Sequence, residues 1–154
     1  MSKKITTSLW FDGNAEEAAN FYTSIFKDSK ITRISRYGDA GPGPKGSVMV
    51  VAFELNGQSF IGINGGPHFK FSPAISLMVN CDTQQELDHY WNSLLAGGAP
   101  QQCGWLTDKF GLSWQIVPSI MNELMSDADK ANRVMGAVLK MVKLDIAELQ
   151  RAAA

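Results

Sequence analysis

The 154-residue sequence lacks the features that mark disulfide-rich, nucleic-acid-binding and membrane-spanning proteins. It has two cysteines, Cys81 and Cys103, and no Cys-x-x-Cys pair, which excludes a disulfide framework. Its formal net charge is −1, so nothing indicates nucleic acid or an anionic membrane as a partner. No apolar run is long enough to span a bilayer, and no apolar segment follows the first four residues as it would in a signal peptide. These absences predict a cytoplasmic protein.

The length is that of one domain with a sizeable core, and hydrophobic residues make up 45% of the chain. We expect a single domain over 1–154, organised as a first module (1–66), a second module (73–118) and a helical tail (119–154). The tail carries apolar helix faces, which need the sheet or a second subunit to cover them.

The two modules repeat one order of elements, namely a strand, a helix and three strands. Each helix begins with a capping-box pattern, Asn14 with Glu17 and Thr83 with Glu86, and continues with an apolar face. The helices superimpose at an offset of 69 residues and the last strands at an offset of 54. Such internal repetition indicates a duplicated structural unit. The principal strands are expected at 4–11, 31–37, 47–55, 58–64, 74–80 and 112–117.

The predicted fold class is α+β, with two repeated βαβββ modules followed by the C-terminal helical tail. The last strand of the second module is the most informative segment. The turn 108–111 has aspartate early and glycine late, and it leads into the strand 112–117. Alternation places Ser113, Gln115 and Val117 on one face. Gln115 is a polar residue in an apolar strand, and it is either a binding group or a hydrogen-bonded structural residue.

Two motifs in this doubled unit resemble the vicinal oxygen chelate superfamily, which has the fold of glyoxalases, bleomycin-resistance proteins and certain dioxygenases. They are Asn-x-x-Glu-x-x-x-Phe-Tyr at the first helix and Asp-x-Phe-Gly-x-x-Trp before the last strand. Longer segments look like its PhnB-like branch, and the resemblance covers nearly the whole chain, tail included. Many members of that branch carry the name 3-demethylubiquinone-9 3-methyltransferase. The segments are Phe11-Asp12-Gly13-Asn14-Ala15-Glu16-Glu17-Ala18, Ser76-Leu77-Met78-Val79-Asn80-Cys81-Asp82 and Gly104-Trp105-Leu106-Thr107-Asp108-Lys109-Phe110-Gly111.

The resemblance implies that the two modules form a mixed eight-stranded curved sheet around a cleft, and it implies a homodimer. Metal-dependent members place ligands in the first and last strand of each module. Alignment puts Thr7, Ile61, Ser76 and Gln115 at those positions. Hydroxyls are poor ligands, isoleucine is none and glutamine is neutral, whereas hard or borderline divalent ions need anionic oxygen or imidazole. We therefore predict no metal in this cleft, and no cofactor.

Four residues are candidate ligand contacts on this alignment. Gln115 can orient a ligand through its amide, with Thr7 and Ser76 on the same cleft. Trp105, just before the turn, can wall the pocket by stacking. The alternative for each is a structural role, with Gln115 bonded to backbone and Trp105 packed in the core.

Two further residues are secondary candidates for catalysis. His68 follows a Gly-Gly-Pro turn, and histidine is a residue type that serves as a general base, but an exposed loop histidine has the same sequence context. Glu54 is a carboxylate near the end of an apolar strand; it is either a base with a raised pKa or a strand end in water.

The sequence thus predicts a glyoxalase-like, PhnB-like protein that binds a small apolar or aromatic molecule in a metal-free cleft. The alternatives are a metal-dependent enzyme of the same superfamily (a lyase, isomerase, dioxygenase or thiol transferase) and a structural dimerisation module, so catalysis is left open. Methyl transfer has no support from the residues. No Gly-rich loop joins a strand to a helix as in nucleotide-type folds, and no parallel βαβαβ run is present.

Overall fold

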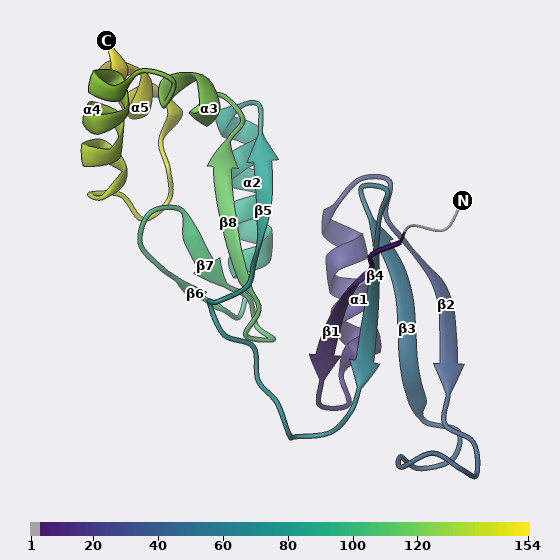
Figure 1. Ribbon diagram of the computed structural model, residues 1–154. Coiled ribbons are helices and arrows are strands. Elements are labelled where there is room, and N and C mark those ends of the chain that lie inside the picture. The colour runs from purple at the N-terminus through teal and green to yellow at the C-terminus, as the bar shows by residue number, and fades with distance from the viewer. Residues whose placement is uncertain (1–3) are drawn as a thin grey trace. The chain divides into compact units, whose positions relative to one another are not determined.

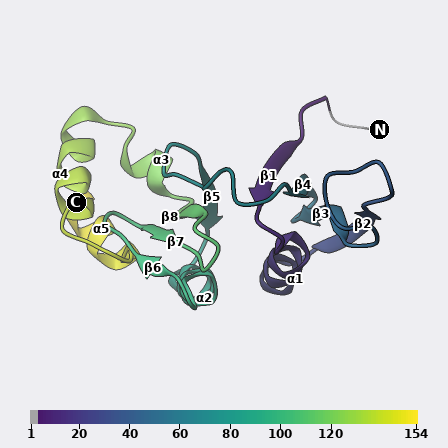
Figure 2. The same ribbon diagram turned by 90° about the horizontal axis from the view of Figure 1, so that it is seen from below.

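The computed structural model describes residues 4–154 and divides into two compact units, Met1–Lys70 and Phe71–Ala154 (Figure 1). Each unit contains a four-stranded mixed sheet, and the strand orders β1-β4-β3-β2 and β5-β8-β7-β6 are the same topology. Viewed from below, α1 and α2 each lie along one face of their own sheet (Figure 2). The α+β fold of two βαβββ modules is thereby confirmed. Across residues 4–154, no helix combines the length and the apolar character that a membrane crossing requires.

The first unit places its core between α1 and one face of its sheet. Tyr22 of α1 is fully buried, its ring lies 6.3 Å from that of Phe53, and Phe53 stacks on Phe60 at 5.5 Å. The predicted hairpin turn is present, with Asn56 at φ +49° and Gly57 at φ +80°, the positive values that a type I′ turn requires. The elements are β1 (Thr7–Phe11), α1 (Ala15–Ile25), β2 (Lys30–Arg36), β3 (Val48–Leu55) and β4 (Gln58–Asn64).

The predicted capping box at the start of α1 is wrong. Asn14 is the N-cap residue, but its backbone has φ −113° and ψ +26° instead of an extended conformation, and its side chain caps no helix N–H. The acceptor comes from the end of β4, where Asn64 Oδ1 accepts a hydrogen bond from Ala15 N at 2.9 Å. Asn64 is only 8% exposed, and its Nδ2 donates to Val48 O at 3.1 Å. A distant strand thus caps this helix.

The second unit repeats the arrangement with shorter strands. Its helix is capped as predicted, because Thr83 Oγ1 accepts a hydrogen bond from Glu86 N at 3.1 Å and the Glu86 carboxylate accepts one from Asp82 N at 3.0 Å. Leu87, Trp91 and Leu94 form its buried face. The elements are β5 (Ser76–Cys81), α2 (Gln84–Leu95), β6 (Ala99–Pro100), β7 (Trp105–Thr107) and β8 (Ser113–Pro118).

The two helix starts provide a matched pair of substitutions. Thr83→Ala removes the side-chain acceptor of α2 and is expected to lower the free energy of unfolding by about 1 kcal/mol. Asn14→Ala removes a side chain that caps nothing and is expected to leave stability within about 0.5 kcal/mol. Chemical denaturation of both variants checks this, and equal losses would contradict the assignment of Asn64 as the cap of α1.

The turn between β7 and β8 is held by one buried carboxylate. Asp108 is 3% exposed, and its Oδ1 accepts from Phe110 N at 2.8 Å and from Leu112 N at 3.1 Å. Its Oδ2 accepts from Trp114 Nε1 at 2.8 Å. The predicted turn 108–111 is therefore confirmed, and Asp108 ties it to the strand that carries Gln115.

The tail is helical, as predicted, and belongs to the second unit. It contains α3 (Met121–Leu124), α4 (Ala128–Val138) and α5 (Ile146–Ala153). Val134 and Leu149 of these helices are fully buried, and α4 and α5 contact each other. The tail thus contributes its own buried apolar residues to unit two.

Candidate functional site

The second unit contains a pocket of about 290 Å³ between its sheet and the tail helices. The sheet contributes residues from the face that α2 does not cover, and the tail contributes residues from α3, α4 and the segment before α5. The sheet residues are Met78, Asn80, Trp105, Gln115, Val117 and Pro118. The tail residues include Ser119, Met121, Asn122, Met125, Met135, Val138 and Leu144.

Strand pairing brings three of the predicted ligand contacts together. Gln115 lies opposite Trp105 in the antiparallel pair β7–β8 and opposite Met78 in the parallel pair β5–β8. Its Nε2 donates to Ser76 Oγ at 2.9 Å. Gln115 and Trp105 both line the pocket, and Ser76 holds the amide that enters it. The hydrogen-bonded structural role considered for Gln115 is present, with a side chain as its partner, and it leaves the carbonyl oxygen to accept from a ligand.

Thr7 does not stand at the position equivalent to Ser76. In β1, Thr7 lies opposite Phe60. At the offset of 54 between the last strands, Phe60 corresponds to Trp114, and the residue of β5 opposite Trp114 is Leu77. The first strands are therefore related by 70 residues, whereas the helix N-caps are related by 69. The extra residue lies in the turn before α1, where Gly13 adopts φ +84°.

The shift by one residue reverses the face on which Thr7 lies. Alternation groups it with Leu9 and Phe11, which are buried on the side of α1. A Cβ on Gly62, opposite Leu9, would meet Ala15 at 3.2 Å, which identifies this side as the helix face. The alignment that gave Thr7 a place on the same face as Gln115 is wrong, because one offset was applied to strand and helix alike.

A buried hydroxyl beside this site was not among the candidates. Ser113 is fully buried on β8 and lies opposite Ser76, and its Oγ has no hydrogen-bond partner within residues 4–154. Buried polar groups are usually paired, so an exception marks a position where polar chemistry is retained at a cost. The alternation Ser113–Gln115–Val117 was the available signal in the sequence.

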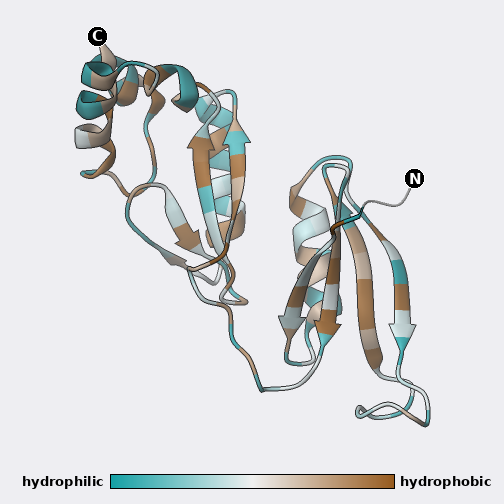
Figure 3. Ribbon diagram, viewed as in Figure 1, coloured by the Kyte–Doolittle hydropathy of each residue, from teal (hydrophilic) through white to brown (hydrophobic). Residues whose placement is uncertain are grey.

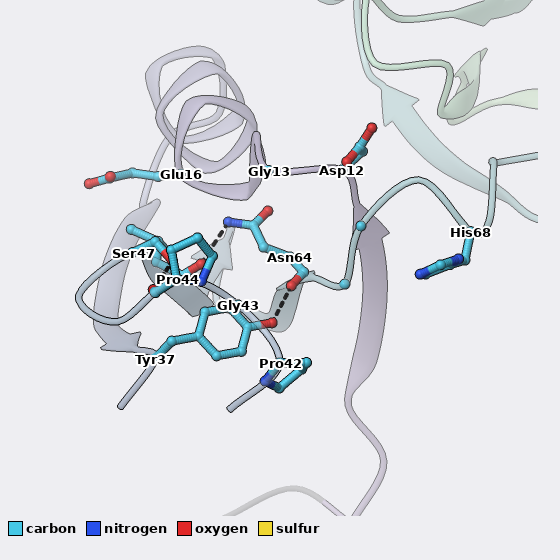
Figure 4. Close-up of a pocket in the computed structure, with 13 residues that line it drawn as sticks. Asp12, Gly13, Glu16, Tyr37, Pro42, Gly43, Pro44, Ser47, Asn64 and His68 are labelled. Carbon is cyan, nitrogen blue, oxygen red and sulfur yellow. Dashed lines mark hydrogen bonds between the residues drawn. The ribbon is translucent and has the colours of Figure 1, made fainter. Parts of the chain in front are cut away.

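The first unit contains a pocket of about 490 Å³ around Asn64, lined in part by the loop before β3 (Figure 4). Tyr37 ties this loop to the end of β4, since its hydroxyl donates a hydrogen bond to Asn64 O at 2.6 Å. His68, a secondary catalytic candidate, lines this pocket with Glu16 and Asp12. In Figure 4, His68 and Glu16 lie on opposite sides of Asn64, and the Asp12 carboxylate points away from it. The titratable groups therefore do not converge on one point.

Glu54 lines neither of these pockets. It is half-buried on β3, where it pairs with Lys30 of β2 and Ser59 of β4. By alternation with the buried Phe53 and Leu55, its side chain lies on the sheet face away from α1. This placement brings no further candidate group to it, and its catalytic role stays a prediction.

The donors of the Gln115 pocket do not fit a hard divalent metal. Gln115 and Ser76 are neutral, and the amide nitrogen of one is already bonded to the hydroxyl of the other. Within residues 4–154, no group of three or more His, Cys, Asp or Glu side chains is placed to hold an ion. Cys103 lines the pocket. The pKa of the other thiol, Cys81, is raised to about 12, mainly by burial and in part by the charges of Glu86 and Asp82. A metal-free cleft remains a prediction that metal analysis tests.

Comparison with known proteins decides the family. The model of the family described as 3-demethylubiquinone-9 3-methyltransferase matches residues 3–117. The chain belongs to this family. A PhnB protein from Bacillus cereus that bears the same description is 45% identical, with a TM-score of 0.69 over 75% of this chain and 99% of that one. The predicted resemblance to the PhnB-like branch is confirmed. No curated protein matches the chain.

More distant structures share the fold. Protein PA1353 from Pseudomonas aeruginosa is 23% identical, with a TM-score of 0.61 over 75% of this chain and 96% of that one. The fosfomycin resistance protein FosX from Listeria monocytogenes, solved with Mn(II) and sulfate, is 13% identical, with a TM-score of 0.56 over 82% of this chain and 97% of that one. The fold of this chain is therefore shared with these two proteins.

The family match ends before the tail. The residues from 118 onward lie outside the matched range, and three-quarters of this chain already covers almost all of the Bacillus cereus protein. The family match thus does not cover the tail, and the expected resemblance of the tail stays a prediction. Half of the pocket wall in unit two thus comes from a segment outside the part that the family match describes.

Proposed function

We propose that this PhnB-like protein binds a small apolar or aromatic molecule in the pocket of unit two, without a metal. The observation that supports the proposal most directly is the position of Gln115, whose amide enters a pocket lined by methionines and Trp105 and is held by Ser76. Small-molecule sites are mostly apolar with a few placed polar groups, and this pocket has that composition. A cytoplasmic location and a homodimer stay predictions alongside it.

Methyl transfer, the activity named in the family description, is not the function that we propose. Each sheet contains one parallel strand pair, β1–β4 or β5–β8, and the rest is antiparallel. A doubly wound parallel sheet with a Gly-rich turn is the usual frame for a nucleotide-type cofactor, and these sheets do not fit it.

The metal-dependent alternative is tested by metal content. Protein purified without a chelator or a metal-affinity tag is expected to contain far less than one metal per chain by elemental mass spectrometry. The expectation follows from the neutral donors at Gln115 and Ser76. Near one metal per chain, lost in Gln115→Ala, would overturn the metal-free proposal and favour a metal-dependent enzyme.

The ligand role of Gln115 is tested by substitution. Ligands that raise the melting temperature of the wild type are identified by thermal shift, and Gln115→Ala is expected to bind them about fivefold more weakly, since one hydrogen bond is worth about 1 kcal/mol. Gln58→Ala removes an exposed glutamine on β4 of the other unit and serves as the matched control. Equal affinity of Gln115→Ala and wild type would count against the proposal.

A further inference from the structure

We propose that the C-terminal segment 119–154 is the specificity element of the unit-two pocket, and that its methionines select planar aromatic ligands over aliphatic ligands of the same size. The inference rests on the proposed function, because it names the ligand class of the same pocket. It goes beyond the family, because the segment lies outside the family match.

The segment is built into unit two through the connection between α4 and α5. Gln84 Nε2 donates to Leu144 O at 3.2 Å, and Gln84 Oε1 accepts from Ile146 N at 2.8 Å. Two backbone bonds hold the same stretch, from Cys103 N to Met141 O at 2.8 Å and from Gly104 N to Val142 O at 2.7 Å. The connection between α4 and α5, which includes the pocket residue Leu144, is therefore hydrogen-bonded to the rest of the unit.

An ion pair adds to this anchoring. Lys143 Nζ lies 2.9 Å from Asp88 Oδ1, and Gln84 Nε2 donates to the same carboxylate oxygen at 2.9 Å. The hydrogen bonds from Lys143 and Gln84 lower the pKa of Asp88. Both charges are well exposed, so the pair orients the connection more than it stabilises the fold.

The methionines of the pocket are not needed to fill the core of the tail. That core consists of Leu124, Val134, Leu144 and Leu149, all buried. In Figure 3 the tail helices carry hydrophobic and hydrophilic residues side by side, as helices with one buried face do. The methionines stand at the pocket instead: Met135 is 41% exposed, and Met78 on the facing strand is 54% exposed.

Thioether side chains suit an aromatic ligand. Methionine is unbranched and polarisable, adapts to irregular shapes and makes favourable contacts between sulfur and aromatic rings. Met121, Met125 and Met135 of the tail and Met78 of β5 line one pocket together with Trp105. A planar ring held between Trp105 and these sulfurs would gain contacts that a saturated chain does not.

The size and polarity of the pocket narrow the ligand further. A volume of about 290 Å³ lies at the small end of the range for small-molecule pockets, so the pocket suits a compact ligand. Gln115 supplies a hydrogen-bonding group on the sheet side. The geometry therefore suits a compact aromatic molecule with one polar substituent that contacts Gln115.

The test compares 1-naphthol with decan-1-ol, which have the same number of non-hydrogen atoms and one hydroxyl each. Calorimetric titration of the full chain is expected to show 1-naphthol binding roughly tenfold more tightly than decan-1-ol. Met121→Leu combined with Met125→Leu keeps the side-chain volume and removes two sulfurs. It is expected to weaken 1-naphthol binding about tenfold, since each sulfur–aromatic contact accounts for about two- to tenfold, and to leave decan-1-ol binding unchanged.

Met141→Leu is the matched control, because Met141 belongs to the tail but does not line the pocket, and it is expected to bind both probes as the wild type does. If the double variant melts at a lower temperature, Met135→Leu on α4 provides the same test from a second helix. Equal 1-naphthol affinity in the methionine variants and the wild type, with weaker binding in Gln115→Ala, would overturn the specificity role and leave the proposed function standing. If the wild type binds neither probe, this inference is wrong and the proposed ligand class loses its support.

Discussion

Replacing Asp108 with alanine is expected to lower the free energy of unfolding by roughly 3–5 kcal/mol, a large fraction of the stability of an ordinary domain. The carboxylate is 3% exposed and accepts three hydrogen bonds. Without it, the N–H groups of Phe110 and Leu112 and the indole of Trp114 lose this acceptor in a buried place. Leaving buried donors without an acceptor costs more than the net value of the bonds themselves. Chemical denaturation measures the loss.

Two variants sharpen the result. Asp108→Asn keeps one acceptor oxygen for the turn but turns an amide N–H toward Trp114 Nε1, so an intermediate loss is expected. Asp39→Ala is the surface control, since Asp39 is 86% exposed and pairs with an exposed lysine, and it is expected to stay within about 0.5 kcal/mol of the wild type. A loss below about 1.5 kcal/mol in Asp108→Ala would contradict the structural role of this carboxylate.

The prediction bears on function, because the Asp108 turn sets the register between β7 and β8. That register places Trp105 opposite Gln115 at the pocket. A relaxed turn in the Asp108 variants is expected to lower the affinity for the ligand as well as the free energy of unfolding. The turn was recognisable in the sequence from aspartate and glycine at fixed spacing, but the reach of its carboxylate to Trp114 was not, since that contact depends on the strand geometry.

The repeat made most of the fold predictable. Capping at Thr83, the hairpin at Asn56-Gly57 and the apolar helix faces are local signals that tertiary contacts reinforce. The failures occur where a distant residue replaces a local one. Asn64 caps α1 from 49 residues away, and nothing near Asn14 announces it. The structure also separates the eight strands into two four-stranded sheets, each with its own helix.

The candidate site was predictable to the extent that strand alternation determines it. Gln115, Ser76 and Trp105 come together because pairing in β5–β8–β7 is regular. The prediction for Thr7 is wrong because one additional residue before α1 shifts β1 by one position in the alignment. Side chains alternate between the two faces of a strand, so this shift places Thr7 on the opposite face. The tail wall could not be placed, since the apolar faces of its helices were compatible with covering the sheet or a second subunit.

Gly104→Ala is the second substitution with a large expected effect, a loss of about 2–4 kcal/mol. Gly104 adopts φ +85°, a conformation that costs an L-residue roughly 1–2 kcal/mol. A Cβ there would lie 2.9 Å from Leu144 Cγ and 3.1 Å from Ile116 O, and Leu144 is 1% exposed. Because Leu144 lines the pocket, the tail connection would be displaced and binding of 1-naphthol would weaken as well.

Gly136→Ala is the control with the opposite sign. Gly136 lies within α4, a Cβ there would meet nothing within 4 Å, and alanine is the better helix former by up to about 1 kcal/mol. Denaturation is expected to show Gly136→Ala more stable and Gly104→Ala less stable than the wild type. Hydrogen exchange locates the loss of stability in Gly104→Ala. The amide of residue 104 donates to Val142 O, and the amide of Ile146 donates to Gln84 Oε1. Unchanged protection of both amides in Gly104→Ala would contradict the view that Gly104 lets the tail connection pack against the sheet.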